Sequence, residues 1–233
     1  MLLKLNGLTA GYGELQVLHG INLEVGAGEV VALIGANGAG KTTTLLTISG
    51  VLRPRAGSIV FDDQDVTGLP PYQIARLGLV QVPEGRQLFA GLTVLENLTM
   101  GAYSKRNGQA RRLQEVFELF PILADRQGQV AGTMSGGQQQ QVAIGRALMA
   151  EPKLLMLDEP SLGLDPITTA NVFSVVQRIR EMNVSVLIVE QNAVHTLRLA
   201  DRGYVLESGQ VVLQGKASDL LANPGLRSAY LGL

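Results

Sequence analysis

The residues best suited to chemistry form one continuous stretch that matches G-x-x-x-x-G-K-[ST], the pattern of a phosphate-binding loop. Its glycines let backbone N–H groups curl around an anion without interference from a Cβ atom. Lys41 can reach the outer phosphates of a nucleotide, and the Thr42 hydroxyl can ligate Mg²⁺. The stretch consists of Gly35, Ala36, Asn37, Gly38, Ala39, Gly40, Lys41, Thr42 and Thr43.

The residues on either side supply the strand and the helix that such a loop needs. Residues 30–34 form an unbroken apolar run, which predicts a strand buried on both faces. Residues 42–49 predict a helix, whose amino terminus would add partial positive charge beside the phosphates. We therefore predict that the chain binds a nucleoside triphosphate.

A pair of acidic residues follows a second buried strand. Residues 154–157 are apolar, and Asp158 and Glu159 come directly after them. Ligands of open α/β sheets bind at the carboxyl ends of the strands, which favours Asp158 as a partner of Mg²⁺ and Glu159 as the general base for an attacking water. The alternative is an ordinary strand followed by a solvated acidic turn.

A second candidate anion site comprises Ser135, Gly136, Gly137 and Gln138, ahead of a helix predicted over residues 139–149. The alternative is an ordinary helix cap with a flexible approach. One triphosphate does not need two phosphate sites in one chain. A two-fold pair of chains would use both, because the second site of each chain would close over the nucleotide of the other.

The aromatic and imidazole side chains are few and their roles are open. Tyr12 is the only aromatic residue before Phe61, and we expect it to lie on a glycine-flanked loop. It could stack on an adenine ring, or it could be a packed surface tyrosine. His19 and His195 are interpreted as a strand-turn residue and a residue of the polar face of a helix, and neither is assigned a role.

The chain divides into an α/β core with a helical insertion. Alternating apolar residues and frequent glycines before residue 30 predict an antiparallel β flap. Residues 93–150 show helical patterns and polar loops without a convincing strand, beginning at a capping box, Thr93 to Glu96, and with residues 104–109 as the most exposed loop. We expect residues 1–92 and 151–233 to form the nucleotide-binding core and residues 93–150 a helical subdomain.

Composition excludes several classes of protein. The 233 residues carry a net charge of −1, less basic than a dedicated nucleic-acid binder, so we expect no nucleic-acid partner. The absence of cysteine excludes disulfides, cysteine-ligated zinc and thiol chemistry. No apolar run approaches the ~18–20 residues that span a bilayer. We expect a soluble intracellular protein that docks on a membrane protein.

With these motifs in order, the chain resembles the ATP-binding cassette (ABC) ATPases along its full length. Tyr12 matches the adenine-stacking residue, residues 35–43 match Walker A, and Met134-Ser-Gly-Gly-Gln138 matches the LSGGQ signature with Met in place of Leu. Residues 154–158 match Walker B, Glu159 matches the catalytic glutamate, and residues 161–165 match the D-loop. The resemblance implies a P-loop NTPase fold, with ATP and Mg²⁺ as cofactors.

Two positions depart from the family pattern. Glu84, in Val-Pro-Glu-Gly-Arg, stands where the family usually has a glutamine that touches Mg²⁺, and Gln191 stands where it usually has a histidine. Gln81 is a rival for the first role, but the Pro-Glu-Gly frame favours Glu84. We expect Glu84 to contribute to Mg²⁺ coordination, and Gln191 to support hydrolysis through a hydrogen bond to the γ-phosphate without histidine-like titration.

The segments around these two positions resemble one subgroup, the LivF-type ATPase of the bacterial branched-chain amino-acid importers. Two further segments share the resemblance, Gly132-Thr-Met-Ser-Gly-Gly137 and Leu199-Ala-Asp-Arg-Gly-Tyr-Val-Leu206. The resemblance implies pairing with a homologous ATPase, as a heterodimer or in isolation a homodimer, beneath two transmembrane permeases on the cytoplasmic face of the inner membrane. An extracytoplasmic binding protein would deliver the substrate. The permeases would dock near residues 84–103, where Phe89 and Leu92 either contact them or simply pack the subdomain.

Other functions stay open beside branched-chain amino-acid import. The subgroup also includes importers of other amino acids, amides and urea. A non-transport ABC ATPase would usually carry coiled-coil or zinc insertions, or two cassettes in one chain. A regulatory switch that binds ATP without turnover is disfavoured by the intact Glu159.

Overall fold

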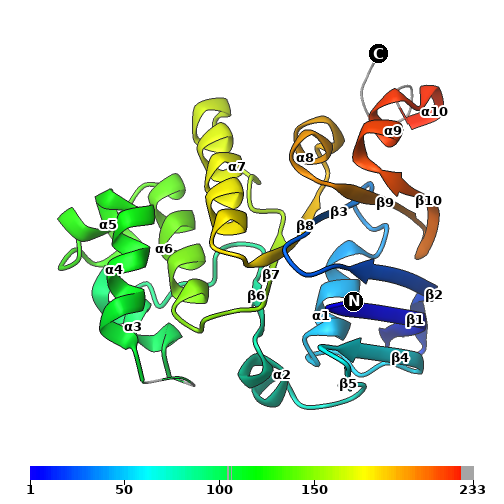
Figure 1. The fold of residues 1–233 in the computed structure, drawn as a ribbon, viewed down its shortest axis with the longest axis horizontal. Helices are drawn as coiled ribbons and strands as arrows, with labels where there is room; N and C mark the ends of the chain where they lie inside the picture. The colour runs from blue at the N-terminus through cyan, green and yellow to red at the C-terminus, as the bar shows by residue number, and fades with distance from the viewer. Residues whose placement is uncertain (104, 106, 227–233) are drawn as a thin grey trace.

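The computed structural model describes residues 1–103, 105 and 107–226, and it contains two β-sheets with helices on both sides (Figure 1). The smaller sheet is antiparallel, with strand order β2-β1-β4-β5. Its strands are β1 (Leu3–Tyr12), β2 (Leu15–Val25), β4 (Ala56–Phe61) and β5 (Gln64–Asp65). Leu3 and Leu5 pair with Val25 and Leu23, and all four side chains are buried. The predicted antiparallel flap is confirmed.

The larger sheet has the order β10-β9-β3-β8-β7-β6. The five strands β9, β3, β8, β7 and β6 run parallel to one another. The edge strand β10 pairs antiparallel with β9 as the second arm of a hairpin. The strands are β3 (Val30–Ile34), β6 (Leu79–Val82), β7 (Leu154–Asp158), β8 (Ser185–Glu190), β9 (Arg202–Glu207) and β10 (Gln210–Lys216). Every residue of β3, β7 and β8 is buried, which is why the sequence reads there as unbroken apolar runs.

Helices cover both faces of this sheet. The first part of the chain contributes α1 (Lys41–Ile48) and α2 (Pro71–Leu77). The predicted insertion contains α3 (Val94–Gly101), α4 (Gln109–Leu119), α5 (Pro121–Asp125), a 3₁₀ turn η1 (Ala131–Thr133) and α6 (Gly136–Leu148). The last part contributes α7 (Pro166–Glu181), α8 (Ala193–Leu199), α9 (Ala217–Ala222) and α10 (Pro224–Leu226).

The hydrophobic core has one half on each face of the larger sheet. Along β3, Val30, Ala32 and Ile34 join the half that includes α6, α7 and α8. Val31 and Leu33 point the other way and join the half that includes α1 and the antiparallel sheet. Because successive side chains of a strand face opposite sides, one short strand ties both halves together. The phosphate-binding stretch begins where this strand ends.

Helices α3 to α6 lie together at one side of the molecule, away from the antiparallel sheet (Figure 1). Thr93 caps α3 in the predicted capping box, since its Oγ1 accepts from Glu96 N at 3.2 Å and Glu96 Oε2 accepts from Thr93 N at 2.7 Å. An isolated bridge joins Thr93 to Val130, and no named strand occurs in the described part of residues 93–150. The subdomain boundaries themselves stay a prediction.

One predicted segment is only partly described. The loop predicted over residues 104–109 includes residues 104 and 106, which lie outside the described residues, and α4 already begins at Gln109. Near the carboxyl end, Asn223 separates α9 from α10, and residues 227–233 lie outside the described residues.

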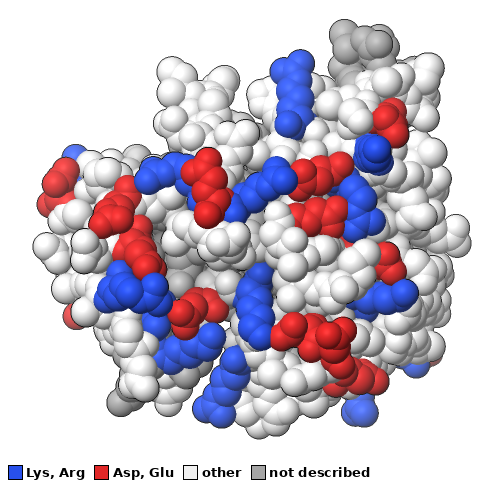
Figure 2. All heavy atoms as spheres, viewed as in Figure 1, with Lys and Arg blue, Asp and Glu red and all other residues white. Residues whose placement is uncertain are grey.

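Basic and acidic side chains are interspersed over the face shown in Figure 2. Several of them pair across elements, for example Arg180 with Asp201 at 2.9 Å and Lys153 with Asp62 at 2.5 Å. Within the part of the chain that the structure describes, no helix is both long and apolar enough to cross a membrane.

Candidate functional site

The phosphate-binding stretch turns sharply from β3 into α1, and two of its glycines are required by geometry. A Cβ atom on Gly35 would lie 2.4 Å from the carbonyl oxygen of Leu206, so no larger residue fits there. Gly40 caps α1 with φ +106°, a left-handed conformation that disfavours other residues. The predicted strand, glycine-rich turn and helix are confirmed, which places the helix amino terminus beside the loop amides.

Lys41 is buried at the centre of this turn, with 4% of its surface exposed. Its Nζ donates to the carbonyl oxygens of Gly35 at 2.9 Å and Ala36 at 3.1 Å. It also forms an ion pair with Glu159 Oε1 at 3.0 Å. The structure therefore brings together the predicted phosphate-binding cation and the predicted general base, which are far apart in the sequence.

Asp158 is the last residue of β7 and is almost fully buried. Its Oδ1 accepts a hydrogen bond from Thr42 Oγ1 at 3.1 Å, whereas its Oδ2 is buried without a hydrogen-bond partner. Burial is the main cause that raises the pKa of Asp158 to about 6; the Thr42 hydrogen bond opposes the shift, and the charges of Glu84 and Glu159 add to it. A buried carboxylate oxygen without a partner, beside a hydroxyl and other acids, fits a divalent cation.

The donor set suits Mg²⁺ held jointly with phosphates. Among the described residues, no group of three or more His, Cys, Asp or Glu side chains could hold a metal by itself. Mg²⁺ is usually bound through one or two carboxylates, several waters and substrate phosphates. Thr42, Asp158 and Glu84 are the residues that could hold it here.

Glu84 lies in the turn beyond β6 and is exposed, and its negative charge acts on Asp158. Its rival Gln81 lies within β6 opposite Met156, and its Nε2 is buried without a hydrogen-bond partner. The electrostatic effect on Asp158 favours Glu84.

Replacing Glu84 with glutamine should raise the Mg²⁺ concentration required for half-maximal ATPase activity by about 10-fold, because one negative charge facing the cation is lost. A titration of ATPase rate against Mg²⁺ at fixed ATP measures this. Glu118→Gln, an exposed glutamate on α4, is the matched control. An unchanged Mg²⁺ dependence in Glu84→Gln would show that Glu84 does not contact the metal.

Glu159 is held in an unusual backbone conformation just after β7. Its φ is +44°, in the left-handed region. Its N–H donates to Val189 O of the neighbouring strand β8 at 2.9 Å. This turn directs the carboxylate toward Lys41 rather than along the sheet edge, so the interpretation as an ordinary solvated acidic turn does not describe it.

Gln191 follows β8 and lines a cavity of about 680 Å³ together with Glu159 and Ser161. Strands β7 and β8 are adjacent and parallel, which brings Gln191 and Glu159 to the same sheet edge. Glu190, in the same cavity wall, was not singled out in the sequence. The sequence could have indicated it, because Glu190 follows an apolar run just as Asp158 does.

Tyr12 is the final residue of β1, not a loop residue as predicted, because the strand continues into a hairpin in which Tyr12 pairs with Leu15. Its side chain is 48% exposed, and its hydroxyl lies 3.5 Å from Thr43 Oγ1. An exposed ring beside the phosphate-binding helix is compatible with adenine stacking, which stays a prediction.

The second candidate anion site begins α6. Ser135 Oγ accepts from Gln138 N at 3.4 Å, and Gln138 Oε1 accepts from Ser135 N at 3.1 Å, a complete capping box. A Cβ on Gly137 would lie 2.4 Å from Thr168 Cγ2, and one on Gly136 would lie 3.2 Å from the Arg86 guanidinium. Among described residues, no hydrogen bond or ion pair connects this site with residues 35–43 of the same chain.

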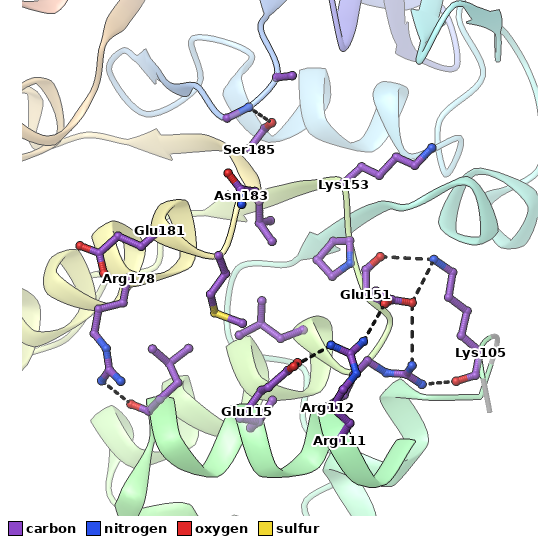
Figure 3. A pocket seen from close by; sticks show the side chains of 18 of the residues that line it. Lys105, Arg111, Arg112, Glu115, Glu151, Lys153, Arg178, Glu181, Asn183 and Ser185 are labelled. Carbon is purple, nitrogen blue, oxygen red and sulfur yellow. Dashed lines mark hydrogen bonds and ion pairs between the residues drawn. The ribbon is translucent and has the colours of Figure 1, made fainter. Parts of the chain in front are cut away.

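A larger cavity, of about 920 Å³, lies near the amino ends of β7 and β8, at the opposite sheet edge (Figure 3). Glu151 there forms ion pairs with Arg111 at 3.2 Å and Lys105 at 3.7 Å, and Arg178 donates to Leu119 O at 3.0 Å. These contacts fasten α4 to the core. The cavity contains none of the predicted site residues.

Comparison with known proteins agrees with this geometry. Residues 18–162 match the protein family described as ABC transporter. The chain is 49% identical over 232 residues to the high-affinity branched-chain amino acid transport ATP-binding protein BraG of Pseudomonas aeruginosa. The aligned residues cover 99% of this chain and 100% of BraG. It is 34% identical over 236 residues to the lipopolysaccharide export system ATP-binding protein LptB of Escherichia coli, covering 99% and 97% of the two chains.

A solved structure extends the comparison to a nucleotide complex. The dimeric post-hydrolysis state of the ATP-binding cassette MJ0796, bound to ADP and Pi, superposes with a TM-score of 0.82 at 26% identity. The match covers 92% of this chain and 98% of MJ0796. The predicted fold class, an α/β P-loop cassette with an antiparallel flap and added helices, is confirmed.

Proposed function

Since the chain belongs to the ABC transporter family, whose members bind and hydrolyse ATP, we propose that it is the ATPase subunit of an importer of branched-chain amino acids. The observation that carries this proposal is the 49% identity to BraG over both complete lengths. Identity to the exporter subunit LptB is lower, at 34%. The transported substrates are leucine, isoleucine and valine.

ATP hydrolysis uses the residues gathered at the carboxyl edge of the larger sheet. Lys41 and the amides of residues 35–43 bind the phosphates, which draws Lys41 away from Glu159. Glu159 then accepts a proton from the water that attacks the γ-phosphate, and Gln191 donates a hydrogen bond to that phosphate. Thr42, Asp158 and Glu84 are the residues that would hold Mg²⁺, which would neutralise negative charge on the phosphates.

A second ATPase chain completes each site. Among the described residues, no hydrogen bond or ion pair links the signature residues Ser135, Gly136, Gly137 and Gln138 to the phosphate-binding stretch of their own chain. This supports a role toward the nucleotide of a partner chain. The dimeric state of MJ0796 supports pairing in this family. We expect a heterodimer with a homologous ATPase, or a homodimer in isolation, that closes on ATP and reopens after hydrolysis.

The ATPase pair acts on two permeases at the cytoplasmic face of the inner membrane, which receive substrate from an extracytoplasmic binding protein. Phe89, 47% exposed with Arg146 stacked 5.3 Å from its ring centre, offers a contact in the proposed docking segment near residues 84–103. Leu92 lies in the same segment and is half-buried.

Uptake of labelled leucine, isoleucine and valine tests the substrate class. Cells whose own copy is replaced by Glu159→Gln should lose uptake of all three, with normal uptake of an unrelated solute. An unlabelled panel of other amino acids, amides and urea should compete poorly in wild-type cells. Unchanged branched-chain uptake in the variant would overturn the substrate assignment, and strong competition by another compound would identify a different cargo.

A further inference from the structure

Glu190 is a buried carboxylate for which the mechanism above has no role. It is the last residue of β8, and only 3% of its surface is exposed. In the sheet register it lies opposite Ile34, the residue that precedes the phosphate-binding stretch. Its neighbour Val189 lies opposite Asp158 on the other side. Glu190 therefore occupies the centre of the sheet edge at which ATP is bound.

The carboxylate has a specific partner in the turn that follows Glu159. Its Oε1 accepts the backbone N–H of Ser161 at 3.0 Å. Burial is the main cause that raises the pKa of Glu190; hydrogen bonds from the side chain and backbone of Ser161 oppose the shift, and the charge of Glu159 adds to it. A buried carboxylate is costly unless it is well hydrogen-bonded, so an apolar residue would be the simpler choice if packing alone were required.

The hydrogen bond to Ser161 restrains the residue proposed as general base. Ser161 is two positions after Glu159, and Leu162 N donates back to Glu159 O at 3.1 Å, which closes the turn. Two hydrogen bonds connect the end of β8 to this turn. Val189 O accepts from Glu159 N at 2.9 Å, and the Glu190 carboxylate accepts from Ser161 N. Glu159 has φ +44°, an unfavourable conformation for a non-glycine residue that persists only under such restraint.

We propose that Glu190 is a positioning residue for ATP hydrolysis, whose carboxylate holds the Ser161 amide so that Glu159 points at the phosphate site. The proposal rests on the proposed role of Glu159 as the general base. Among the described residues, Glu190 forms no hydrogen bond or ion pair with Lys41 or Thr42, whose side-chain polar partners are Gly35, Ala36, Asp158 and Glu159. Its loss should therefore lower kcat without weakening ATP binding.

Two conservative changes separate the length of the side chain from its charge. Glu190→Gln keeps an oxygen at the same distance for the Ser161 N–H but loses the charge, and kcat should stay within about 3-fold of wild type. Glu190→Asp keeps the charge but withdraws the carboxylate by one methylene, and kcat should fall about 10-fold or more. ATP affinity, measured by equilibrium binding, should change less than 3-fold in both variants.

A matched control lies on the same strand. Ser185 begins β8, is buried, and accepts Gly28 N at 2.8 Å at the opposite sheet edge. Ser185→Ala removes a comparable hydrogen bond away from the site, so it should lower the midpoint of thermal unfolding and leave kcat unchanged. A kcat that falls as much in Ser185→Ala as in Glu190→Asp would overturn the proposal, because the effect would then be structural.

Glu159→Gln, measured in parallel, distinguishes failure of the two claims. If Glu159→Gln still hydrolyses ATP, the general-base assignment fails whatever Glu190 does. If Glu159→Gln is inactive but Glu190→Asp retains the wild-type kcat, the positioning role is overturned and the general base stands. The positioning role would also be overturned if kcat fell in Glu190→Gln but kept its wild-type value in Glu190→Asp. That result would show that the charge of the side chain matters and its length does not.

Discussion

Replacing Glu159 with glutamine should lower the kcat for ATP hydrolysis by about 10²- to 10⁴-fold, the usual contribution of a general base. The amide fills the same space but cannot accept the proton of the attacking water. ATP binding should persist, because the groups proposed to bind the phosphates are Lys41 and the amides of the preceding turn. Because closed pairs would no longer reopen by hydrolysis, ATP should also shift the variant from monomer to dimer in size-exclusion chromatography with light scattering.

Glu181→Gln provides the control, since Glu181 is exposed at the end of α7. Its kcat and its association state should equal those of the wild type. A Glu159→Gln protein that turns over ATP at the wild-type rate would contradict the assignment of Glu159 as the general base.

Replacing Lys41 with methionine should weaken ATP binding by about 10- to 100-fold, the range expected for the loss of a charge-assisted hydrogen bond. The side chain is 4% exposed, so its charge acts in a water-poor setting, and the substitution keeps most of its volume. It also leaves Glu159 without its ion-pair partner. Isothermal titration with a slowly hydrolysed ATP analogue measures the affinity directly.

Lys153→Met is the matched control for Lys41→Met. Lys153 is 52% exposed and pairs with Asp62 at 2.5 Å near the amino end of β7, away from the phosphate-binding stretch. Its loss should leave the affinity for the analogue unchanged. Equal affinities of wild type and Lys41→Met would mean that the phosphates bind elsewhere.

The local elements of this fold were largely predictable because each has a short-range cause. The unbroken apolar runs that became β3, β7 and β8 record burial on both faces, and the start of α3 was fixed by the Thr93 capping box. The Tyr12 segment was predicted wrongly as a loop, because its glycines masked a strand whose pairing with β2 is set by residues outside it.

The site was predictable in its residue types but not in its contacts. Ion pairing of Lys41 with Glu159 depends on the order β3-β8-β7, which no local pattern encodes. The restraint of Ser161 by Glu190 likewise needs two strand ends to be adjacent. Glu190 was overlooked because its neighbour Gln191 carried the family resemblance, although both follow the same apolar run.

The most direct test is leucine transport by the purified ATPase and its permeases in proteoliposomes. The ATPase subunits face the vesicle interior, which contains ATP. With binding protein and labelled leucine outside, wild-type complexes should accumulate leucine while ATP is hydrolysed. Glu159→Gln complexes should do neither, although they bind ATP. Leucine accumulation by the Glu159→Gln complex, or wild-type hydrolysis that no branched-chain amino acid accelerates, would contradict the claim that this chain powers their import.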